Sequence, residues 1–380
     1  KARKALSKFL KYYPKNSFAF EARKMLTALG GALAVGGDKA DYKVGLILPL
    51  SGHFESYGMS VLEGVRCAAG YKNLCEDFSG IELVVRDSGL TPASVRLAVE
   101  QLVQQKVVAI IGPLSGSLAV EAGMIANRYQ IPIFPITQKK GVMEQGEFIF
   151  QVGFLPHQQV DALVSEAFSR GHRSFGVFYP NNNYGKTMSE LFVAAVRERG
   201  GKITAQTEYN RRSPDPYAEV RKLKKMVGRF DKPTSKVGFD AVFIPDSYRL
   251  INALVPAFEF QEITGVALIG TNAWNDPSLS ELIQTSYPGS FFVDLYNPKG
   301  KGRRVNEFVS KFRSSFGHDP RVLEAYGYDI LNIIRALASS KGPKKLQQTL
   351  MHAYGIDGVT GLKGFKGDGP VVDSVIIDVK

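Results

Sequence analysis

The chain is poor in the residues from which enzymes build reactive and metal-binding sites. Its 380 residues include two cysteines, one tryptophan and five histidines, and the histidines show no spacing typical of metal ligands. The sequence also lacks G-x-S-x-G, H-E-x-x-H, a P-loop and G-x-G-x-x-G. No apolar run reaches about 18 residues, the length that a transmembrane helix needs. We therefore expect a protein that is not an enzyme, holds no cofactor or metal, and has no membrane-spanning helix.

The two cysteines, Cys67 and Cys75, are close in sequence. Cys67 falls late in a predicted helix that Gly70 can end, so the chain can double back by Cys75. An oxidising compartment would allow them to form a disulfide, which is the expectation we adopt. The alternative is a pair of free, half-buried thiols.

Positive charge is the one surplus in the composition. The net charge is +12, whereas 44% hydrophobic and 22% charged residues are ordinary for a soluble globular protein. Residues 1–43 hold ten basic and three acidic residues, and residues 197–236 hold twelve and five. The second region has few aromatic residues and no nucleic-acid-binding motif, so we expect no nucleic-acid partner. It indicates a solvated basic face, or one that faces an anionic membrane or polymer.

The first 41 residues differ in pattern from the rest of the chain. Residues 1–29 show two helical apolar stripes, broken at Pro14–Asn16, and partly match the end of a tetratricopeptide repeat. A single helical hairpin cannot bury its own apolar face. We therefore expect it to dock on the rest of the chain or to be the remnant of a longer array. The glycine-rich residues 30–41 predict a flexible linker.

From residue 42 onward strands and helices alternate, which is typical of parallel α/β sheets. The central unit has a buried strand at Val107–Ile111, a helix to about Tyr129 and a second strand at Ile131–Phe134. A similar set of alternating elements begins at about residue 155. Two such sets, joined by extended crossings, predict two lobes.

The predicted fold class is α/β, with two Rossmann-like lobes joined by a multi-strand hinge and a cleft between them. At 380 residues, two lobes also agree with the usual size of a single core. We expect a strand over 290–296 to return to the first lobe and the tail, with its final run 371–379, to form a β-hairpin or meander. The predicted first lobe comprises residues 42–154 and 289–353, and the second comprises residues 155–288 and 354–380.

Ligands of such sheets bind outside the carboxyl ends of the strands. In the central unit these ends are Gly112–Ser117 and Pro135–Gln138. Small hydroxyl side chains and free amides at a helix N-terminus favour an anionic or carbonyl group. Ser115 and Ser117 either contact such a group or only cap the helix, and the local sequence leaves both open.

Five stretches occur in an order that is typical of one family. They are the strand and S-G-x-x-x-x-Y-G loop within Lys43–Gly58, the strand ends Ile111–Ser117 and Phe134–Gln138, the Y-G turn Asn183–Gly185, and the V-x-G-x-x-x-F turn within Gly358–Gly367. In this order they resemble the type I periplasmic binding proteins, specifically the branched-chain amino-acid-binding (Leu/Ile/Val-binding) family. The resemblance covers roughly Asp41 to Lys380.

The resemblance implies that two lobes close on a small solute held by strand-end residues. The residues that line the cleft by match are Tyr57, Ser115, Gly116, Ser117, Ile136, Thr137, Gln138, Tyr184, Ser247 and Asn272. The candidate set also contains Ser51, His53, Phe54, Phe154, Asp246 and Trp274. His53 fits a surface loop as well as a ligand contact. Trp274 either stacks on a ligand or fills the rim of the second lobe's core.

Three positions depart from the family's amino-acid-binding pattern. Gly116 stands where the family places a carboxylate-binding serine, although Ser115 and Ser117 flank it. Ser247 replaces a ligand-contacting aromatic residue, and Asn272 replaces the acid that holds the ligand ammonium. Asp246 is adjacent to Ser247 and is the one candidate that could substitute for that acid.

The resemblance implies a periplasmic or extracellular solute-binding protein that serves an ABC permease. The tetratricopeptide-like leader favours an alternative, because the penicillin-binding-protein activator lipoproteins carry such a leader ahead of a domain of the same fold. These activators work by protein contact with a penicillin-binding protein near peptidoglycan, an anionic polymer that suits a basic surface. Either function places the chain outside the cytoplasmic membrane. Anchoring by a lipid on residues that precede Lys1 is compatible with both.

Overall fold

The structure is a computed structural model, and the chain in it forms two compact units. The first comprises Lys1–Gly153 and Pro298–Asp373, and the second comprises Phe154–Asn297 and Ser374–Lys380. The structure describes residues 5–6, 8–9, 12, 22, 33–35, 41–70, 74–75, 80–213, 215–226, 238–279, 281–338, 342–367 and 369–379. Within these ranges, no helix combines the length and the hydrophobicity that a membrane span needs.

The first unit is built on a five-stranded sheet whose strands lie in the order β1-β3-β2-β4-β5. β2 pairs in parallel with both β3 and β4, β4 pairs in parallel with β5, and β1 pairs antiparallel with β3. Most residues of the parallel strands are apolar and buried, as a sheet covered on both faces requires. The bounds are β1 Leu33–Val35, β2 Tyr42–Leu48, β3 Ile81–Asp87, β4 Ala109–Ile111 and β5 Ile133–Phe134.

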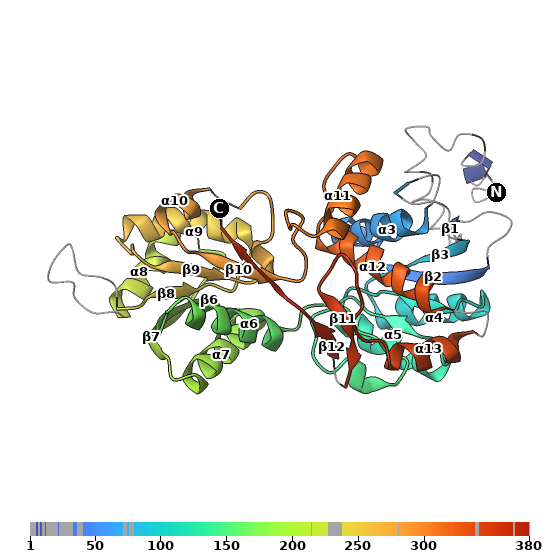
Figure 1. The fold of residues 1–380 in the computed structure, drawn as a ribbon, viewed down its shortest axis with the longest axis horizontal. Helices are drawn as coiled ribbons and strands as arrows, with labels where there is room; N and C mark the ends of the chain where they lie inside the picture. The colour runs from blue at the N-terminus through green and yellow to red at the C-terminus, as the bar shows by residue number, and fades with distance from the viewer. Residues whose placement is uncertain are drawn as a thin grey trace. The chain divides into compact units, whose positions relative to one another are not determined.

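Helices cover both faces of this sheet (Figure 1). α4 (Pro92–Gln104) and α5 (Gly116–Arg128) pack on one face, and α3 (Glu55–Ala69) and α12 (Val322–Leu337) lie on the other. α4 begins at a capped terminus, where the Thr91 hydroxyl accepts a hydrogen bond from the Ser94 amide at 3.1 Å and Pro92 occupies the first turn. The remaining elements of this unit are η1 Gly52–Phe54, η3 Met143–Gln145, α11 Arg303–Phe316, α13 Pro343–Met351, β11 Leu362–Lys366 and β12 Gly369–Val372.

Two glycines let α3 and α12 approach at backbone distance. A Cβ atom at Gly64 would lie 1.9 Å from the carbonyl oxygen of Glu324, and one at Gly327 would lie 2.3 Å from that of Val61. Both distances are far below van der Waals contact. The pairing therefore depends on a glycine from each helix at the crossing.

The second unit has a six-stranded sheet in the order β13-β10-β9-β8-β6-β7. All neighbours are parallel except β13, which pairs antiparallel with β10. Helices α6 and α7 lie on one face and α8, α9 and α10 on the other (Figure 1). The bounds are β6 Ser174–Pro180, β7 Lys202–Tyr209, β8 Ala241–Phe243, β9 Ala267–Gly270, β10 Phe291–Asp294, β13 Val375–Asp378, α6 Pro156–Ser169, α7 Asn183–Glu198, α8 Pro216–Met226, α9 Tyr248–Phe260, η4 Asn272–Trp274 and α10 Leu282–Ser286.

The structure corrects the predicted lobe boundaries at two places. Residues 289–297 belong to the second unit, because β10 pairs with β9 and does not return to the first sheet. Residues 354–373 belong to the first unit, because the buried Asp329 carboxylate of α12 accepts hydrogen bonds from the amides of Val359 and Thr360 at 2.9 and 2.8 Å. The predicted terminal hairpin is likewise divided, since β12 pairs with β11 while β13 pairs with β10.

The N-terminal predictions have different outcomes. The helical hairpin over residues 1–29 lies, apart from a few positions, outside the described residues. The linker predicted over 30–41 was wrong at Leu33–Val35, which form β1 by pairing with β3. The disulfide is confirmed, because Cys67 in the last turn of α3 is bonded to Cys75 with their Cα atoms 4.7 Å apart. Gly70 ends α3 in the left-handed conformation at φ 66°, which turns the chain back as predicted.

Candidate functional site

The candidate residues of the first unit follow the carboxyl ends of β2, β4 and β5. β2 leads into η1 and α3, β4 leads into α5, and β5 leads into an extended segment that bridges to Val152 through Ile136. The exit from β4 is tight, because a Cβ atom at Gly112 (φ 93°) would lie 2.1 Å from the Ile47 carbonyl oxygen of β2. This unit therefore gathers one set of candidates at one edge of its sheet, namely Ser51, His53, Phe54, Tyr57, Ser115, Gly116, Ser117, Ile136, Thr137 and Gln138.

Aromatic side chains are exposed at this edge. Phe54 and Tyr57 are 50% and 53% exposed, and their ring centroids lie 6.2 Å apart. The His53 ring meets Phe54 edge-on at 5.0 Å, and Ser51 is exposed beside it. Large exposed aromatic side chains at a strand-end loop are suited to contact the apolar part of a ligand.

The two serines at the start of α5 do not act as side-chain caps. Ser115 occupies the N-cap position without a capping hydrogen bond from its side chain, and its hydroxyl lies 3.1 Å from that of Ser117. Both side chains are exposed. The first amides of a helix have no intrahelical acceptor, so this terminus offers hydroxyl and amide groups to a carboxylate or carbonyl.

The structure explains why glycine stands at position 116. A Cβ atom there would lie 2.8 Å from the Cβ of Lys139 and 3.2 Å from the hydroxyl oxygen of Thr137. The start of α5 is thus pressed against the segment that follows β5. A serine at this position would have to displace that segment.

Two of the predicted ligand-contact residues have buried side chains that a ligand could not reach. Ile136 is 5% exposed and Phe154 is 1% exposed. Both side chains are buried because they belong to apolar packing, so a ligand could reach only backbone groups at these positions. The Phe154 carbonyl already accepts a hydrogen bond from the amide side chain of Gln159 at 2.8 Å. Thr137 and Gln138 remain half-buried at the edge.

In the second unit the candidates follow the carboxyl ends of β6, β8 and β9. Tyr184 lies in the first turn of α7, Ser247 is the N-cap of α9, and Asn272 lies in η4. The Tyr184 hydroxyl donates a hydrogen bond to the hydroxyl of Thr271 at 3.3 Å, and burial raises its pKa to about 12. Tyr184 is therefore a neutral hydroxyl whose orientation is held by the residue that follows β9.

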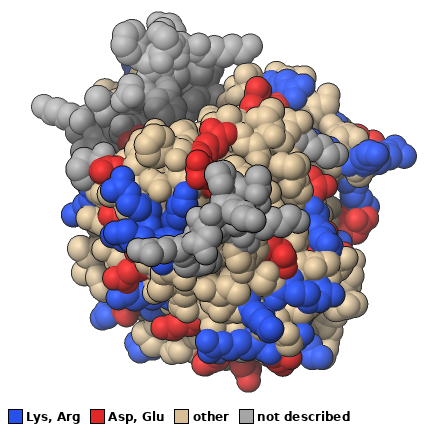
Figure 2. Space-filling view, turned by 90° about the vertical axis from the view of Figure 1, so that its left-hand side faces the viewer, with Lys and Arg blue, Asp and Glu red and all other residues tan. Residues whose placement is uncertain are grey.

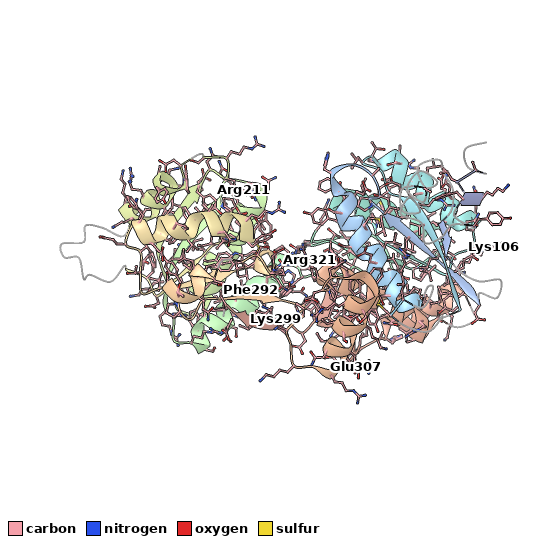
Figure 3. The ribbon with its side chains drawn as sticks, turned by 90° about the horizontal axis from the view of Figure 1, so that it is seen from above. Lys106, Arg211, Phe292, Lys299, Glu307 and Arg321 are labelled. Carbon is pink, nitrogen blue, oxygen red and sulfur yellow. A yellow bond between two sulfur atoms is a disulfide. The ribbon has the colours of Figure 1, made fainter. Side chains whose placement is uncertain are left out.

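The Asp246 carboxylate is already engaged by its own unit. It is 4% exposed, and one oxygen accepts a hydrogen bond from the Tyr209 hydroxyl and forms an ion pair with Arg211 Nε, each at 2.9 Å. The other oxygen accepts from the Ser247 amide at 2.6 Å. Burial and the neighbouring Asp246 charge both raise the pKa of Tyr209, which stays a donor. The carboxylate is thus neutralised by Arg211, a residue at the surface of the second unit (Figure 3).

Tyr209 and Arg211 are further candidate residues, which the sequence did not single out. Tyr209 is the last residue of β7 and Arg211 lies just beyond it, so the strand-end rule applies to them equally. We counted Arg211 only as part of the basic region. Arg211 follows β7 and Asp246 follows β8, and only β6 separates these two strands in the sheet. The strand order therefore brings the two residues together.

The prediction that Trp274 contacts a ligand was wrong. Trp274 is fully buried in a cluster with Phe178, Val242 and Phe258. A Cβ atom at Gly270 would lie 2.0 Å from its indole ring, so β9 and the ring are in direct contact. The alternative, that this side chain fills the core of the second lobe, is confirmed.

Asp294, which the sequence did not single out, is a buried acid at the carboxyl end of β10. Its side chain accepts hydrogen bonds from Asn275 Nδ2 and from the Leu295 amide, each at 2.7 Å. Burial outweighs these bonds and raises its pKa to about 7. No group of three or more His, Cys, Asp or Glu side chains suited to a metal ion occurs among the residues that the structure describes.

The predicted basic region 197–236 contains several ion pairs. Within α8, Lys222 pairs with Glu219 at 2.6 Å, and Lys224 pairs with Glu262 at 3.3 Å. Figure 2 shows basic and acidic side chains interleaved on the face that it draws. This agrees with a solvated, partly neutralised surface. Residues 227–236 lie outside the described part of the chain.

The chain belongs to the periplasmic binding proteins. The model of that family, described as "Periplasmic binding protein", matches residues 41–375, which is most of the chain and includes every candidate residue named above. A curated relative is the penicillin-binding protein activator LpoA of Photobacterium profundum. It is 22% identical over 347 residues, which are 84% of this chain and 53% of that protein. The chain thus spans about half the length of this relative.

Solved structures show the same fold. An ABC transporter substrate-binding protein from Desulfitobacterium hafniense aligns with a TM-score of 0.70 at 17% identity, over 89% of this chain and 97% of that one. The branched-chain amino acid substrate-binding protein LivJ of Streptococcus pneumoniae, in complex with isoleucine, gives 0.67 at 20% over 89% and 95%. A solute-binding protein of Rhodopseudomonas palustris, in complex with 3,4-dihydroxybenzoic acid, gives 0.64 at 18% over 89% and 92%. These likenesses confirm the predicted two-lobed α/β fold class.

Proposed function

We propose that this chain is a non-enzymatic solute-binding protein that acts outside the cytoplasmic membrane and delivers its ligand to an ABC permease. Membership of the periplasmic binding proteins supports the class. The strand-end residues support the chemistry, since they offer hydroxyl groups, free helix amides and exposed aromatic rings. None of these groups forms a nucleophile–base pair or a metal site.

The contacts that already engage Asp246 support a narrower proposal, namely that the ligand has a carboxylate and no ammonium group. A buried ammonium needs an anion beside it, because an unpaired buried charge costs several kcal/mol. Asp246 is the only acid among the candidates, and Arg211 and Tyr209 already bind it. Asn272 is neutral. The second unit therefore supplies no free anion at the candidate positions.

Arg211 also supports a ligand with a carboxylate, because it offers a positive charge to bind one. Its Nε atom lies 2.9 Å from the Asp246 carboxylate, and its side chain is 46% exposed. The terminal nitrogens of a guanidinium are well suited to bind a carboxylate. Among the solved relatives, the protein in complex with 3,4-dihydroxybenzoic acid holds an acid without an ammonium, so the fold accommodates such ligands.

Calorimetric titration with 4-methylpentanoate and 3,4-dihydroxybenzoate tests the proposal. We expect binding of at least one acid to the wild type and a loss of about tenfold or more in Arg211→Met, because the charge-assisted pair with the ligand carboxylate is lost. Arg212→Met is the matched control, since Arg212 is an exposed neighbour without an ion pair to Asp246. An equal loss in both variants would contradict a specific role of Arg211.

A second candidate function is favoured by the match to the penicillin-binding protein activator LpoA, which covers 84% of this chain. In that case the chain would regulate cell-wall synthesis through contact with a penicillin-binding protein. The test is co-purification of penicillin-binding proteins with the chain from membranes of its own cells. Stoichiometric capture, together with no heat of binding from either acid or from leucine, would favour this function over solute transport.

A further inference from the structure

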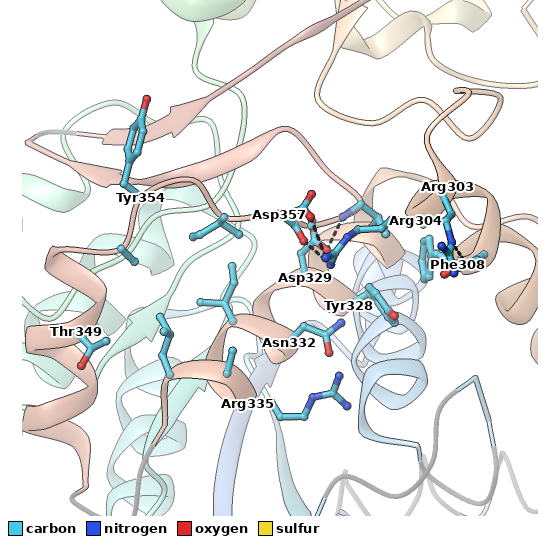
Figure 4. A pocket seen from close by; sticks show the side chains of 18 of the residues that line it. Arg303, Arg304, Phe308, Tyr328, Asp329, Asn332, Arg335, Thr349, Tyr354 and Asp357 are labelled. Atoms are coloured by element: carbon cyan, nitrogen blue, oxygen red, sulfur yellow. Dashed lines mark hydrogen bonds and ion pairs between the residues drawn. The ribbon is translucent and has the colours of Figure 1, made fainter.

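The first unit contains a groove that is separate from the strand-end residues. It lies between α11, α12, α13 and the segment 352–359, and it encloses about 1000 Å³ (Figure 4). None of the candidate ligand residues lines it. Its volume is at the upper end of the range for small-molecule pockets, which is roughly 300–1,000 Å³.

The groove has an apolar floor and an open rim. Phe308, Ile333 and Val359 form buried parts of the floor, and the Phe308 ring packs on Tyr328 with centroids 4.5 Å apart. At the rim, Tyr354 is 81% exposed and the Arg303 side chain is 91% exposed. A small molecule in such a site would leave much of its surface in water, whereas a chain segment could lie along it.

The arginines of the groove include one guanidinium without a carboxylate partner in the described part of the chain. Arg303 pairs with Glu307 at 2.7 Å, and Arg304 pairs with Asp357 at 2.8 Å. Arg335, in the last turn of α12, donates to the Ala68 carbonyl at 3.3 Å and has no acidic partner among the described residues. It is exposed and lines the groove together with Tyr328 (Figure 4). An incoming carboxylate could bind there beside an aromatic wall.

The groove is held open by a fixed internal contact. The Asp329 carboxylate accepts hydrogen bonds from the amides of Val359 and Thr360 and from the Thr360 hydroxyl, at 2.9, 2.8 and 2.5 Å. Gly358 is needed at this turn, because a Cβ atom there would lie 2.4 Å from the same carboxylate. This contact ties the segment 352–359 to α12. A ligand therefore meets a preformed site and loses little free energy in ordering it.

We propose that this groove binds a segment of a partner protein that carries an acidic side chain next to an apolar or aromatic one. Arginine and tyrosine are the residues in which protein-binding surfaces are enriched, and here they surround an apolar floor. Arg335 selects the acid, and the apolar floor with the adjoining Tyr328 ring receives the apolar side chain. The inference does not depend on the solute, because the groove shares no residue with the strand-end set.

Selection from a phage-displayed library of random peptides on the intact chain tests this proposal. We expect the selected peptides to contain Asp or Glu beside Leu, Phe or Trp. Synthetic copies should bind the wild type and lose about tenfold or more on Arg335→Glu and on Tyr354→Ser. Arg128→Glu is the matched control, because Arg128 is also an exposed arginine in the last turn of a helix of the first unit.

Four results would overturn the proposal. Selected peptides without acidic enrichment, or equal binding to Arg335→Glu and the wild type, would remove the role of Arg335. An equal loss of peptide affinity in Arg128→Glu would show that the effect of Arg335→Glu comes only from the change in net charge. Binding of phosphatidylglycerol vesicles with the same dependence on Arg335, while no peptide is selected, would assign the groove to an anionic lipid surface. Melting temperatures of each variant within the wild-type range would exclude unfolding as the cause.

Discussion

The crossing of α3 and α12 gives the sharpest test of how packing supports the candidate site. In Gly327→Ala the new Cβ atom would lie 2.3 Å from the Val61 carbonyl oxygen, where ordinary contact begins at 3.4 Å. The helices must therefore separate by roughly 1 Å, against backbone atoms that cannot rotate away. Because α3 carries Tyr57 in its first turn, the aromatic pair with Phe54 moves with it.

Two opposing terms decide the size of the effect. Overpacking costs about 1–3 kcal/mol, and a rigid obstacle favours the upper end. Replacing glycine by alanine inside a helix stabilises the helix by about 1 kcal/mol, because alanine has the higher helix propensity. We expect a net loss near 2 kcal/mol, which lowers the melting temperature of a unit of this size by roughly 4–8 °C.

Differential scanning calorimetry measures this shift. Gly302→Ala is the control, since Gly302 has a φ of −68° and its nearest contact to a new Cβ is 3.8 Å. That variant should stay within about 1 kcal/mol of the wild type, the usual effect of alanine at a helix N-cap. If Gly327→Ala melts at or above the wild-type temperature, helix propensity outweighs the contact and the close crossing is refuted.

Three further predictions concern the second unit and the disulfide. The carboxyl of Asp294 has a pKa of about 7 in the fold and 3.8 in the unfolded chain. Between these two pH values it is protonated in the folded protein and ionised in the unfolded chain. Stability of the second unit should therefore fall by about 4 kcal/mol as pH rises from about 4 to 7. Chemical unfolding followed by Trp274 fluorescence should show this slope, and Asp294→Asn should flatten it; an unchanged slope in the variant refutes the assignment. The fluorescence of Trp274, the sole tryptophan, should resist quenching by acrylamide and should not change when ligand binds. A ligand-induced shift of its emission would instead indicate that the ring stacks on the ligand. Trp274→Ala should lower the free energy of unfolding by roughly 3–5 kcal/mol. Removing the Cys67–Cys75 disulfide by double alanine substitution should cost about 2–3 kcal/mol for its short loop, which calorimetry with and without reductant would check.

The local pattern of the sequence was sufficient to predict which segments become strands and where their polar ends lie. The strand at Val107–Ile111 and its neighbour at Ile131–Phe134 appear as β4 and β5, slightly shortened. Gly112–Ser117 and Pro135–Gln138 were placed at strand ends for the same reason, and they follow β4 and β5. These features depend on neighbouring residues alone, so a single sequence contains them.

Strand order and side-chain partners could not be derived in the same way. The segment near 291–294 reads as a strand in either unit, and only its pairing with β9 assigns it to the second. Likewise, Arg211 follows β7 and Asp246 follows β8, and nothing in the sequence states that one neutralises the other. Trp274 has a polar, loop-like neighbourhood, and its burial follows from the glycine at position 270, which admits the ring. Each of these outcomes depends on contacts between distant residues.

The central claim is that the binding site takes an acid and has no place for an ammonium, because Arg211 and Tyr209 already bind Asp246. The most direct measurement is isothermal titration of the wild type with leucine and with 4-methylpentanoate, which differ only in the ammonium group. We predict that 4-methylpentanoate binds at least about tenfold more tightly, since leucine would bury an unpaired charge. Tighter binding of leucine, abolished by Asp246→Asn, would contradict the claim and assign Asp246 to the ligand.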